Sequence, residues 1–432
     1  MDDALRAWVE ATVGGRVVHT SRPPVGGSRE LHLVDLVQDD SGVLPLVVRC
    51  EGGSSFAGTE VSLAREAVVY RALEDTEVPV PRVVALDADG KILVLERVTG
   101  NGDLDAVDPG ERAAVMATFV DALAALHQLD VDTLSLPGFQ RPRTAEQHAR
   151  LDLEMWQRLA RDGVTDLDPL VRYAGAWLWE HAPATVARTV LVQGDTGPGN
   201  FVFEHGTVTG IVDWEFAHIG DPMDDWAWID MRADPAELPA LHERYARTTG
   251  VDVDLDRIAY YRIAVDYRCA ITTSLAVSRG GGARGWAPYL LVTQRYLDGL
   301  ASRLSARLGV DEQTDLPSVT ATARAQHFGA LVDGIRTAVR HIDDEEIREQ
   351  TRNLLILARY LAAYDEVGEE VEAIDRIDRV ATFGADSEDD ERFLTLVEDA
   401  GTRGDEQVWR YLLRRHTRRR LLWVSLLDRP AR

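Results

Sequence analysis

One stretch of the chain, residues 191–215, restricts the fold and the function more than any other. An apolar run leads into a turn rich in glycine and proline that holds Asp195 and Asn200. Two short alternating segments follow around the turn at His205 and Gly206, and the second segment ends at another acid, Asp213. The pattern predicts a strand, a polar loop and a β-hairpin that returns Asp213 to the neighbourhood of Asn200.

This arrangement suits phosphoryl transfer to a hydroxyl group. Such a reaction needs one carboxylate to orient and deprotonate the hydroxyl, and two oxygen ligands to hold Mg²⁺ against the nucleotide phosphates. We expect Asp195 to be the first group, and Asn200 and Asp213 to be the metal ligands. The spacing D-x-x-x-x-N occurs in kinase catalytic loops, although a polar turn before an ordinary hairpin would also favour these residue types. The second aspartate after the hairpin favours a site.

The same stretch resembles the aminoglycoside phosphotransferase superfamily, whose kinase-like members carry H-G-D-x-x-x-x-N, a hairpin and then I-D-[WF]-E. One residue departs from the family pattern, because Gln193 stands where the family has histidine. That histidine is a scaffold residue in the family, and a glutamine amide can also donate and accept hydrogen bonds. The resemblance further implies that Asp225 braces the catalytic loop and that Asp221 caps a helix that starts at Pro222.

Composition excludes several classes of protein. A net charge of −25 over 432 residues argues against general binding of nucleic acid, which requires lysine and arginine to neutralise phosphates. Lys91 is the only lysine and lies outside any G-x-x-x-x-G-K-[ST] motif, so the chain is no P-loop protein. We find no apolar run of membrane-spanning length, and Met1 opens no signal peptide, so we expect a cytoplasmic protein with no membrane partner.

The first hundred residues have the pattern of a nucleotide-binding lobe. Gly26, Gly27 and Ser28 form a turn between two predicted strands, a position at which kinases lay a loop over phosphates. Arg49 lies on a predicted strand at 44–50, and Glu66 lies on a predicted helix at 63–73. We expect Arg49 to contact the nucleotide phosphates and Glu66 to hold it. A plain hairpin and a surface arginine are the alternatives.

The resemblance supports these assignments. Kinases place lysine on this strand, but a branch of the family that includes kinase domains joined to acyl-CoA dehydrogenases has arginine there. The predicted strand at 92–98 ends where the family has its hinge between lobes. The resemblance therefore implies that the backbone of Glu96 and Val98 binds the purine of a nucleotide.

From residue 110 onwards the apolar spacing is mostly helical. We predict an α+β, bilobal protein-kinase-like fold with a β-rich N-lobe at 1–99, a mainly helical C-lobe at 100–310 and an extra all-α domain at 318–432. The last predicted helix, 406–427, is rich in arginine. It fits either a site for an anionic partner or an amphipathic helix docked on acidic neighbours.

Taken together, the sequence predicts an ATP- and Mg²⁺-dependent O-phosphotransferase for a small-molecule alcohol. An aminoglycoside, a macrolide, a sugar and a hydroxyacyl thioester all remain open as acceptors. One alternative is a kinase-fold protein that binds a nucleotide or metabolite without turnover, which Gln193 and Arg49 favour. Another is an assembly module dominated by the C-terminal helices. The sequence does not indicate an oligomeric state.

Overall fold

The computed structural model describes residues 1–22, 29–38, 42–51, 56–280 and 287–427. It divides into two compact units. The first contains Met1–Asp152 and Pro183–Arg262, and the second contains Leu153–Ala182 and Ile263–Arg432. The second unit thus combines helices of the predicted C-lobe with the C-terminal helices. The predicted lobe boundaries near residues 99 and 310 stay a prediction.

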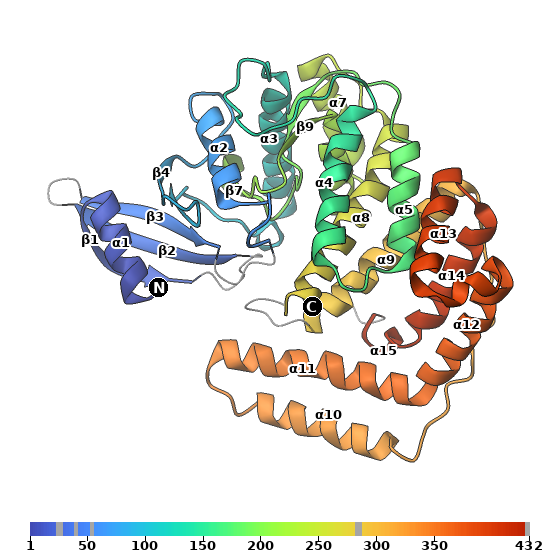
Figure 1. The fold of residues 1–432 in the computed structure, drawn as a ribbon. Coiled ribbons are helices and arrows are strands. Elements are labelled where there is room, and N and C mark those ends of the chain that lie inside the picture. The colour runs from blue at the N-terminus through green and yellow to red at the C-terminus, as the bar shows by residue number, and fades with distance from the viewer. Residues whose placement is uncertain (23–28, 39–41, 52–55, 281–286, 428–432) are drawn as a thin grey trace. The chain divides into compact units, whose positions relative to one another are not determined.

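The N-terminal part of the first unit is a five-stranded antiparallel sheet in the order β1-β2-β3-β5-β4 (Figure 1). Its strands are β1 (Arg16–Ser21), β2 (Glu30–Gln38), β3 (Gly42–Cys50), β4 (Val83–Leu86) and β5 (Ile92–Glu96). Helix α1 (Asp3–Val13) packs Val9 against one core of this sheet, which includes Leu46 and Val48 of β3. Because side chains alternate along a strand, the neighbouring Arg49 points to the opposite face.

Helix α2 (Leu63–Leu73) supplies the partner for that arginine and has the predicted bounds. The Ser62 hydroxyl accepts a hydrogen bond from the Arg65 N–H at 3.3 Å, which caps the helix start. Leu63, Ala67 and Tyr70 bury one side of the helix, and Glu66 is buried on the same helix with 0% exposure. A carboxylate in that position must be paired, since burial of an isolated charge is very costly.

The rest of the first unit holds the predicted catalytic stretch. Its helices are α3 (Pro109–Gln128), α6 (Pro222–Arg232) and α7 (Leu238–Thr249), preceded by the short η1 (Leu104–Ala106). Its strands form two pairs, β6 (Val190–Val192) with β9 (His218–Gly220), and β7 (Phe201–Glu204) with β8 (Thr207–Ile211). His205 and Gly206 have φ values of 50° and 75°, as a two-residue hairpin turn requires. The predicted hairpin is therefore present.

The second unit is helical. Helix α4 (Gln147–Gly163) begins in the first unit and continues into the second, as does α8 (Leu255–Ser278). The other helices of the second unit are α5 (Pro169–Glu180), α9 (Ala287–Leu308), α10 (Ala325–Val339), α11 (Glu345–Ala363), α12 (Glu369–Phe383), α13 (Asp390–Arg403), α14 (Glu406–Arg420) and α15 (Val424–Leu427), with η3 (Tyr364–Gly368) and η4 (Ala385–Glu388).

The predicted helix at 406–427 is interrupted, which corrects that expectation. Helix α14 ends at Arg420, and α15 begins at Val424. Between them the chain turns, so that Leu422 and Trp423 pack with Val367 in a separate small core. Burial of these apolar side chains accounts for the break in a sequence that is otherwise helical.

The arginines of α14 settle the choice between an anionic partner and acidic neighbours. They form ion pairs with acids of the same compact unit, namely Arg410 and Arg414 with Glu312, Arg414 and Arg418 with Asp378, Arg415 with Asp168, Arg418 and Arg419 with Asp375, and Arg420 with Asp298. The interpretation as a helix docked on acidic neighbours is confirmed.

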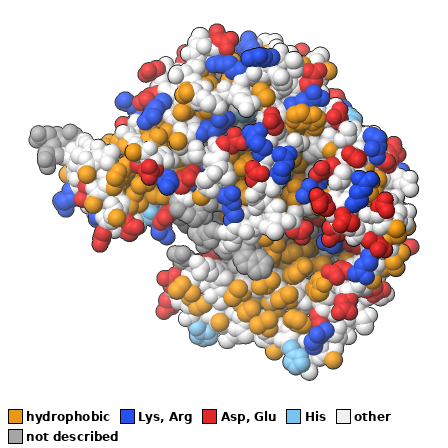
Figure 2. Space-filling view, viewed as in Figure 1, with side chains coloured by type: hydrophobic (Ala, Val, Ile, Leu, Met, Phe, Trp, Pro, Cys, Tyr) orange, Lys and Arg blue, Asp and Glu red, His pale blue; other side chains and the backbone are white. Residues whose placement is uncertain are grey.

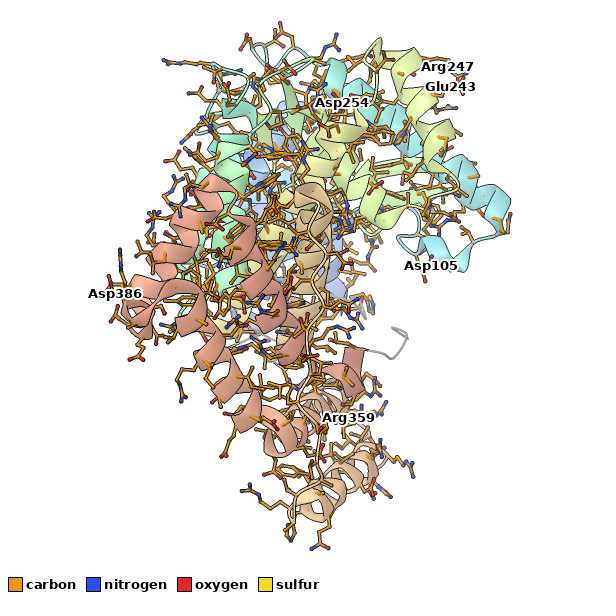
Figure 3. The ribbon with its side chains drawn as sticks, turned by 90° about the vertical axis from the view of Figure 1, so that its right-hand side faces the viewer. Asp105, Glu243, Arg247, Asp254, Arg359 and Asp386 are labelled. Atoms are coloured by element: carbon orange, nitrogen blue, oxygen red, sulfur yellow. The ribbon has the colours of Figure 1, made fainter. Side chains whose placement is uncertain are left out.

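The surface carries an exposed apolar face on α10 and α11 and an exposed ion pair on α7. Helices α10 and α11 lie side by side as a hairpin (Figure 1), and hydrophobic side chains gather on their visible face (Figure 2). Leu331 and Ile347 belong to these helices and are 47% and 53% exposed. On α7, Glu243 and Arg247 point outwards together (Figure 3) and form an ion pair of 3.4 Å. Among the described helices, none is long and apolar enough to span a membrane.

Candidate active site

The catalytic loop, residues 193–200, begins directly after β6. Its second residue, Gly194, has a φ of +85°, and a Cβ atom there would lie 2.4 Å from the Phe216 carbonyl oxygen. No side chain fits at that distance, and the left-handed backbone also favours glycine. The G-D pair of the motif therefore has a steric reason in this chain, because glycine lets the loop run against the segment after β8.

The carboxylate of Asp225, on α6, binds the backbone of this loop. Its carboxylate accepts the Gln193 N–H at 3.0 Å and the Gly194 N–H at 2.9 Å, and lies 2.9 Å from His127 Nε2. His127 in turn contacts the Tyr245 hydroxyl at 2.8 Å, and both residues are buried. The predicted bracing role of Asp225 is confirmed, and His127 is part of the brace.

Asp221 and Gln193 also behave as predicted. The Asp221 carboxylate accepts the Met223 N–H at 3.0 Å and caps α6. The Gln193 amide donates to the backbone carbonyls of Val212 at 3.0 Å and Asp213 at 2.7 Å, and accepts the Asp195 N–H at 2.8 Å. The glutamine thus ties the loop to the end of the hairpin, as a scaffold residue should.

Both oxygens of the Asp195 carboxylate are engaged. Oδ2 accepts a hydrogen bond from Asn200 Nδ2 at 2.5 Å, and Oδ1 accepts one from Arg232 Nη2. Burial raises the pKa of Asp195, whereas Arg232 and the Asn200 amide oppose that rise. The carboxyl group is thus partly buried, hydrogen-bonded to an amide and paired with a cation.

The hairpin returns Asp213 to Asn200 as predicted. The Val212 N–H donates to the Asn200 carbonyl at 2.9 Å, which places the next residue, Asp213, beside the loop. Asp213 has a φ of +58°, a conformation that costs energy in a residue with a side chain and that is concentrated at functional sites. The Asn200 amide oxygen and the Asp213 carboxylate are hard oxygen donors, so this donor set fits Mg²⁺.

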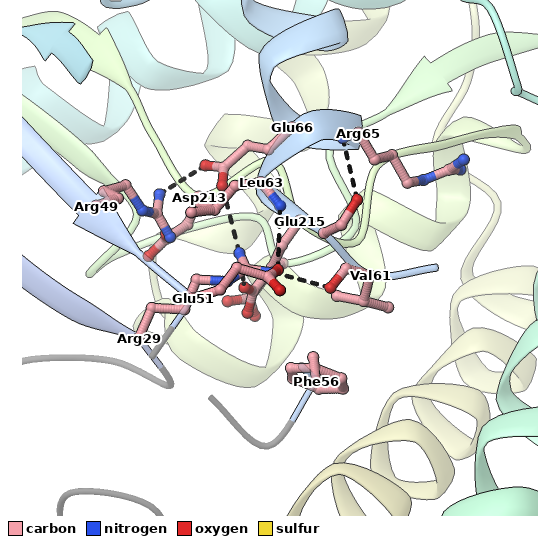
Figure 4. A network of polar contacts seen from close by, with 12 residues as sticks. Arg29, Arg49, Glu51, Phe56, Val61, Leu63, Arg65, Glu66, Asp213 and Glu215 are labelled. Atoms are coloured by element: carbon pink, nitrogen blue, oxygen red, sulfur yellow. Dashed lines mark hydrogen bonds and ion pairs between the residues drawn. The ribbon is translucent and has the colours of Figure 1, made fainter. Parts of the chain in front are cut away.

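Arg49 connects the sheet, α2 and the hairpin (Figure 4). Its Nη1 lies 2.6 Å from Glu66 Oε1, and its Nη2 lies 2.7 Å from Asp213 Oδ1. The guanidinium is buried, and its two acids come from elements far apart in the sequence. The alternative that Arg49 is a surface charge is wrong, because its guanidinium is buried between two acids.

Sequence reasoning missed Arg29, which belongs to the same network (Figure 4). Its Nη1 lies 2.7 Å from Glu215 Oε2 and 3.4 Å from Glu66 Oε2, and its Nη2 donates to the Val61 carbonyl at 2.9 Å. Arg29 thus anchors the glutamate that follows Asp213. Its position beside the glycine turn was the available signal, but no spacing rule connects it to Glu215.

The structure does not test the roles of the remaining predicted site residues. Gly26, Gly27 and Ser28 lie outside the described residues. Glu96 is the last residue of β5, and its N–H donates to the Arg82 carbonyl at 3.0 Å, whereas Val98 packs near Gly210. The purine-binding role of Glu96 and Val98 stays a prediction.

A second buried cluster also escaped the sequence analysis. Asp152, His218 and Asp224 place one ligand atom each within 4.8 Å of one another, and His218 Nε2 lies 3.2 Å from Asp224 Oδ2. Its members come from α4, β9 and α6, so only the folded chain brings them together. The cluster is a histidine between two carboxylates, a set that either pairs charges internally or holds a metal ion.

Similarity to known proteins identifies the family of this chain. The model of the phosphotransferase enzyme family (APH) matches residues 30–261, more than half of the chain. The chain belongs to this family. Membership of this family agrees with the predicted class of enzyme, a phosphotransferase with an alcohol group as acceptor.

Curated relatives of this chain are much longer proteins. The rat protein "Acyl-CoA dehydrogenase family member 11" is 27% identical over 211 residues, which cover 46% of this chain and 27% of the relative. The Arabidopsis thaliana protein "Probable acyl-CoA dehydrogenase IBR3" is 30% identical over 253 residues, which cover 53% of this chain and 30% of the relative. The chain spans less than a third of either relative.

A solved structure supports the fold. Choline kinase LicA from Streptococcus pneumoniae superposes with a TM-score of 0.51 at 18% identity, over 69% of this chain and 98% of that chain. The kinase-like phosphotransferase fold is thus confirmed, with a β-rich N-terminal region and a mostly helical remainder that ends in further helices.

Proposed function

We propose that the chain is an ATP- and Mg²⁺-dependent O-phosphotransferase in which Asp195 orients and deprotonates the acceptor hydroxyl. The observation that carries this proposal is the convergence of Asp195, Asn200 and Asp213 on one loop and hairpin, with Arg49 bonded to Asp213 at 2.7 Å. A base, two oxygen donors and a phosphate-binding cation are the parts that phosphoryl transfer requires.

The roles of the chain's residues follow from their contacts. The Asp195 carboxylate accepts the hydrogen bond of the acceptor hydroxyl and takes its proton as the new bond to phosphorus forms. Asn200 Oδ1 and the Asp213 carboxylate hold Mg²⁺, which when bound neutralises negative charge on the nucleotide phosphates. Glu66 keeps the Arg49 guanidinium in place beside Asp213, where it would contact the phosphates of a bound nucleotide.

Other parts of the proposal rest on the resemblance. Gly26, Gly27 and Ser28 cover the phosphates, and the backbone of Glu96 and Val98 contacts the purine. The acceptor is an aminoglycoside-like alcohol or a hydroxyacyl-CoA-like alcohol, since a similar solved structure carries an aminoglycoside phosphotransferase name and a relative carries an acyl-CoA dehydrogenase name. The location that we propose is the cytoplasm.

The test is Mg²⁺-dependent consumption of ATP in the presence of a panel of alcohols. We expect turnover with one acceptor class by the wild type, and a rate lower by about 10²–10⁴-fold in Asp195→Asn. The matched control is Asp386→Asn, which makes the same change at an exposed acid of η4 outside the catalytic loop and should keep wild-type turnover (Figure 3).

Nucleotide binding provides the second measurement. We expect Asp213→Ala to abolish the Mg²⁺-dependent part of AMP-PNP binding, because it removes a charged metal ligand. Binding without any Asp195-dependent turnover would favour the alternative of a binding protein. Absence of any nucleotide binding by the wild type would reject the proposal.

A further inference from the structure

Arg232, the last residue of α6, lies against the catalytic base. Its Nη2 donates to Asp195 Oδ1, and its Nη1 donates to the Asp195 backbone carbonyl at 2.6 Å. The guanidinium also lies over the Trp228 ring, 4.9 Å from its centroid. Thirty-seven residues separate the two partners in the sequence, so no motif indicated this contact.

Several features leave the Arg232 guanidinium open to an acceptor. Among the described residues, Asp195 is the one carboxylate that forms an ion pair with Arg232. The side chains of Arg232 and Asp195 are 22% and 20% exposed, so both can be reached from solvent. Gly197 of the catalytic loop leaves room for the arginine, since a Cβ atom there would lie 3.3 Å from Arg232 Cδ.

The contact places two demands on an acceptor. Asp195 Oδ2 accepts a hydrogen bond from Asn200 and Oδ1 accepts one from Arg232, so an acceptor hydroxyl that binds Oδ1 lies next to the guanidinium. A cationic group next to that hydroxyl would also meet the guanidinium at short range and be repelled. A carboxylate or phosphate group would instead attract it, because a planar guanidinium binds such groups through two hydrogen bonds.

We propose that Arg232 selects the acceptor by charge, so that the alcohol carries an anionic group close to the reacting hydroxyl. The guanidinium turns from Asp195 Oδ1 to the anionic group of the acceptor and leaves Oδ1 to the hydroxyl. This inference rests on the proposed function, because it assigns the acceptor class of the same site. It excludes an ammonium group at that position in the acceptor.

The test is the binding of alcohols that share carbon number and differ in charge. The probes are 3-hydroxypropionate, 1,3-propanediol and 3-amino-1-propanol, measured by saturation-transfer NMR with and without Mg²⁺–AMP-PNP. We expect the wild type to bind the hydroxy acid at least about tenfold more tightly than the amino alcohol. Arg232→Gln should reduce this ratio to below about threefold, and Arg232→Lys should keep part of it because it retains the charge.

The matched control is Arg247→Gln, which removes the same charge from an exposed position on α7 and should keep the wild-type ratio. Equal or undetectable binding of the three probes by the wild type would overturn the inference, as would an unchanged ratio in Arg232→Gln. This test can fail independently of the proposed function, because the charge preference is measured by binding and the proposed function by turnover. Asp195-dependent turnover without charge preference would reject the role of Arg232 alone.

Discussion

Two networks of arginines and acids in this protein differ in a way that separates function from stability. The site network consists of Arg29, Arg49, Glu66, Asp213 and Glu215, and the helix network consists of Arg414, Arg415, Arg418, Asp168, Asp375 and Asp378. Both are built from ion pairs of similar length, so the number of pairs does not distinguish them.

The difference is clearest between one pair of the site network, Arg49 with Asp213, and one pair of the helix network, Arg418 with Asp375. In the site network the Asp213 side chain is 36% exposed and its backbone is left-handed, although its partner Arg49 is buried. In the helix network the pair of Arg418 and Asp375 is only 4% and 8% exposed. Asp213 is accessible and has a strained backbone, so its carboxylate can exchange Arg49 for a ligand. The buried pair of Arg418 and Asp375 only stabilises the packing of helices.

The largest effect should follow from removal of the base. Asp195→Asn should lower the rate of phosphoryl transfer by about 10²–10⁴-fold, because an amide cannot take the hydroxyl proton. The thermal unfolding midpoint should stay close to that of the wild type, and steady-state kinetics would measure the rate. A variant that keeps more than a tenth of the wild-type rate would show that Asp195 is not the catalytic base.

Glu66 tests the buried centre of the site network. Glu66→Gln should lower the free energy of unfolding by about 3 kcal/mol, since it removes the acid that Arg29 and Arg49 share in the interior. It should also weaken nucleotide binding, because Arg49 loses its anchor. Urea denaturation followed by tryptophan fluorescence would measure the first effect, and titration with AMP-PNP the second. A loss of stability without any loss of nucleotide binding would make this network purely structural.

Asp168 tests the helix network through its dependence on pH. Burial alone would raise the pKa of Asp168, but the Arg415 guanidinium at 2.8 Å and the Leu170 N–H together outweigh burial and lower it to about 2. A carboxylate with a lowered pKa stabilises the fold above its unfolded-state pKa, and this contribution disappears as the pH falls towards the folded-state value. Asp168→Asn keeps the cap on Leu170 but removes the charge.

We therefore expect Asp168→Asn to cost about 2 kcal/mol of unfolding free energy near neutral pH. The difference from the wild type should be constant between about pH 7 and 5 and shrink below about pH 4. Urea denaturation at several pH values would measure it, and nucleotide binding should not change. A difference that grows at low pH would contradict the assigned ion pair.

The smallest effect should come from the exposed pair on α7. Arg247→Gln should change the unfolding free energy by less than about 0.5 kcal/mol, because exposed ion pairs are screened by water and salt. Phosphoryl transfer should also be unaffected. A larger effect on either quantity would show that charge alone, rather than burial and accessibility, controls these networks.

Local patterns predicted much of the fold and of the candidate site. The bounds of α2, the two-residue turn at His205 and Gly206, and the cap at Asp221 follow from rules that act over a few residues. The interruption between α14 and α15 was not predicted, because it results from packing of Trp423 against residues of a distant helix. Apolar spacing alone cannot show such a partner.

The sequence by itself determined the candidate site, since Asp195, Asn200 and Asp213 lie within one loop and hairpin whose path is set by local turns. It also indicated that Gln193 could replace a scaffold histidine, since both side chains form hydrogen bonds. Only the tertiary structure decided which cations meet these acids. Arg232 and Arg29 reach their partners across 37 and 186 residues, and ion pairs over such separations depend on how whole elements pack.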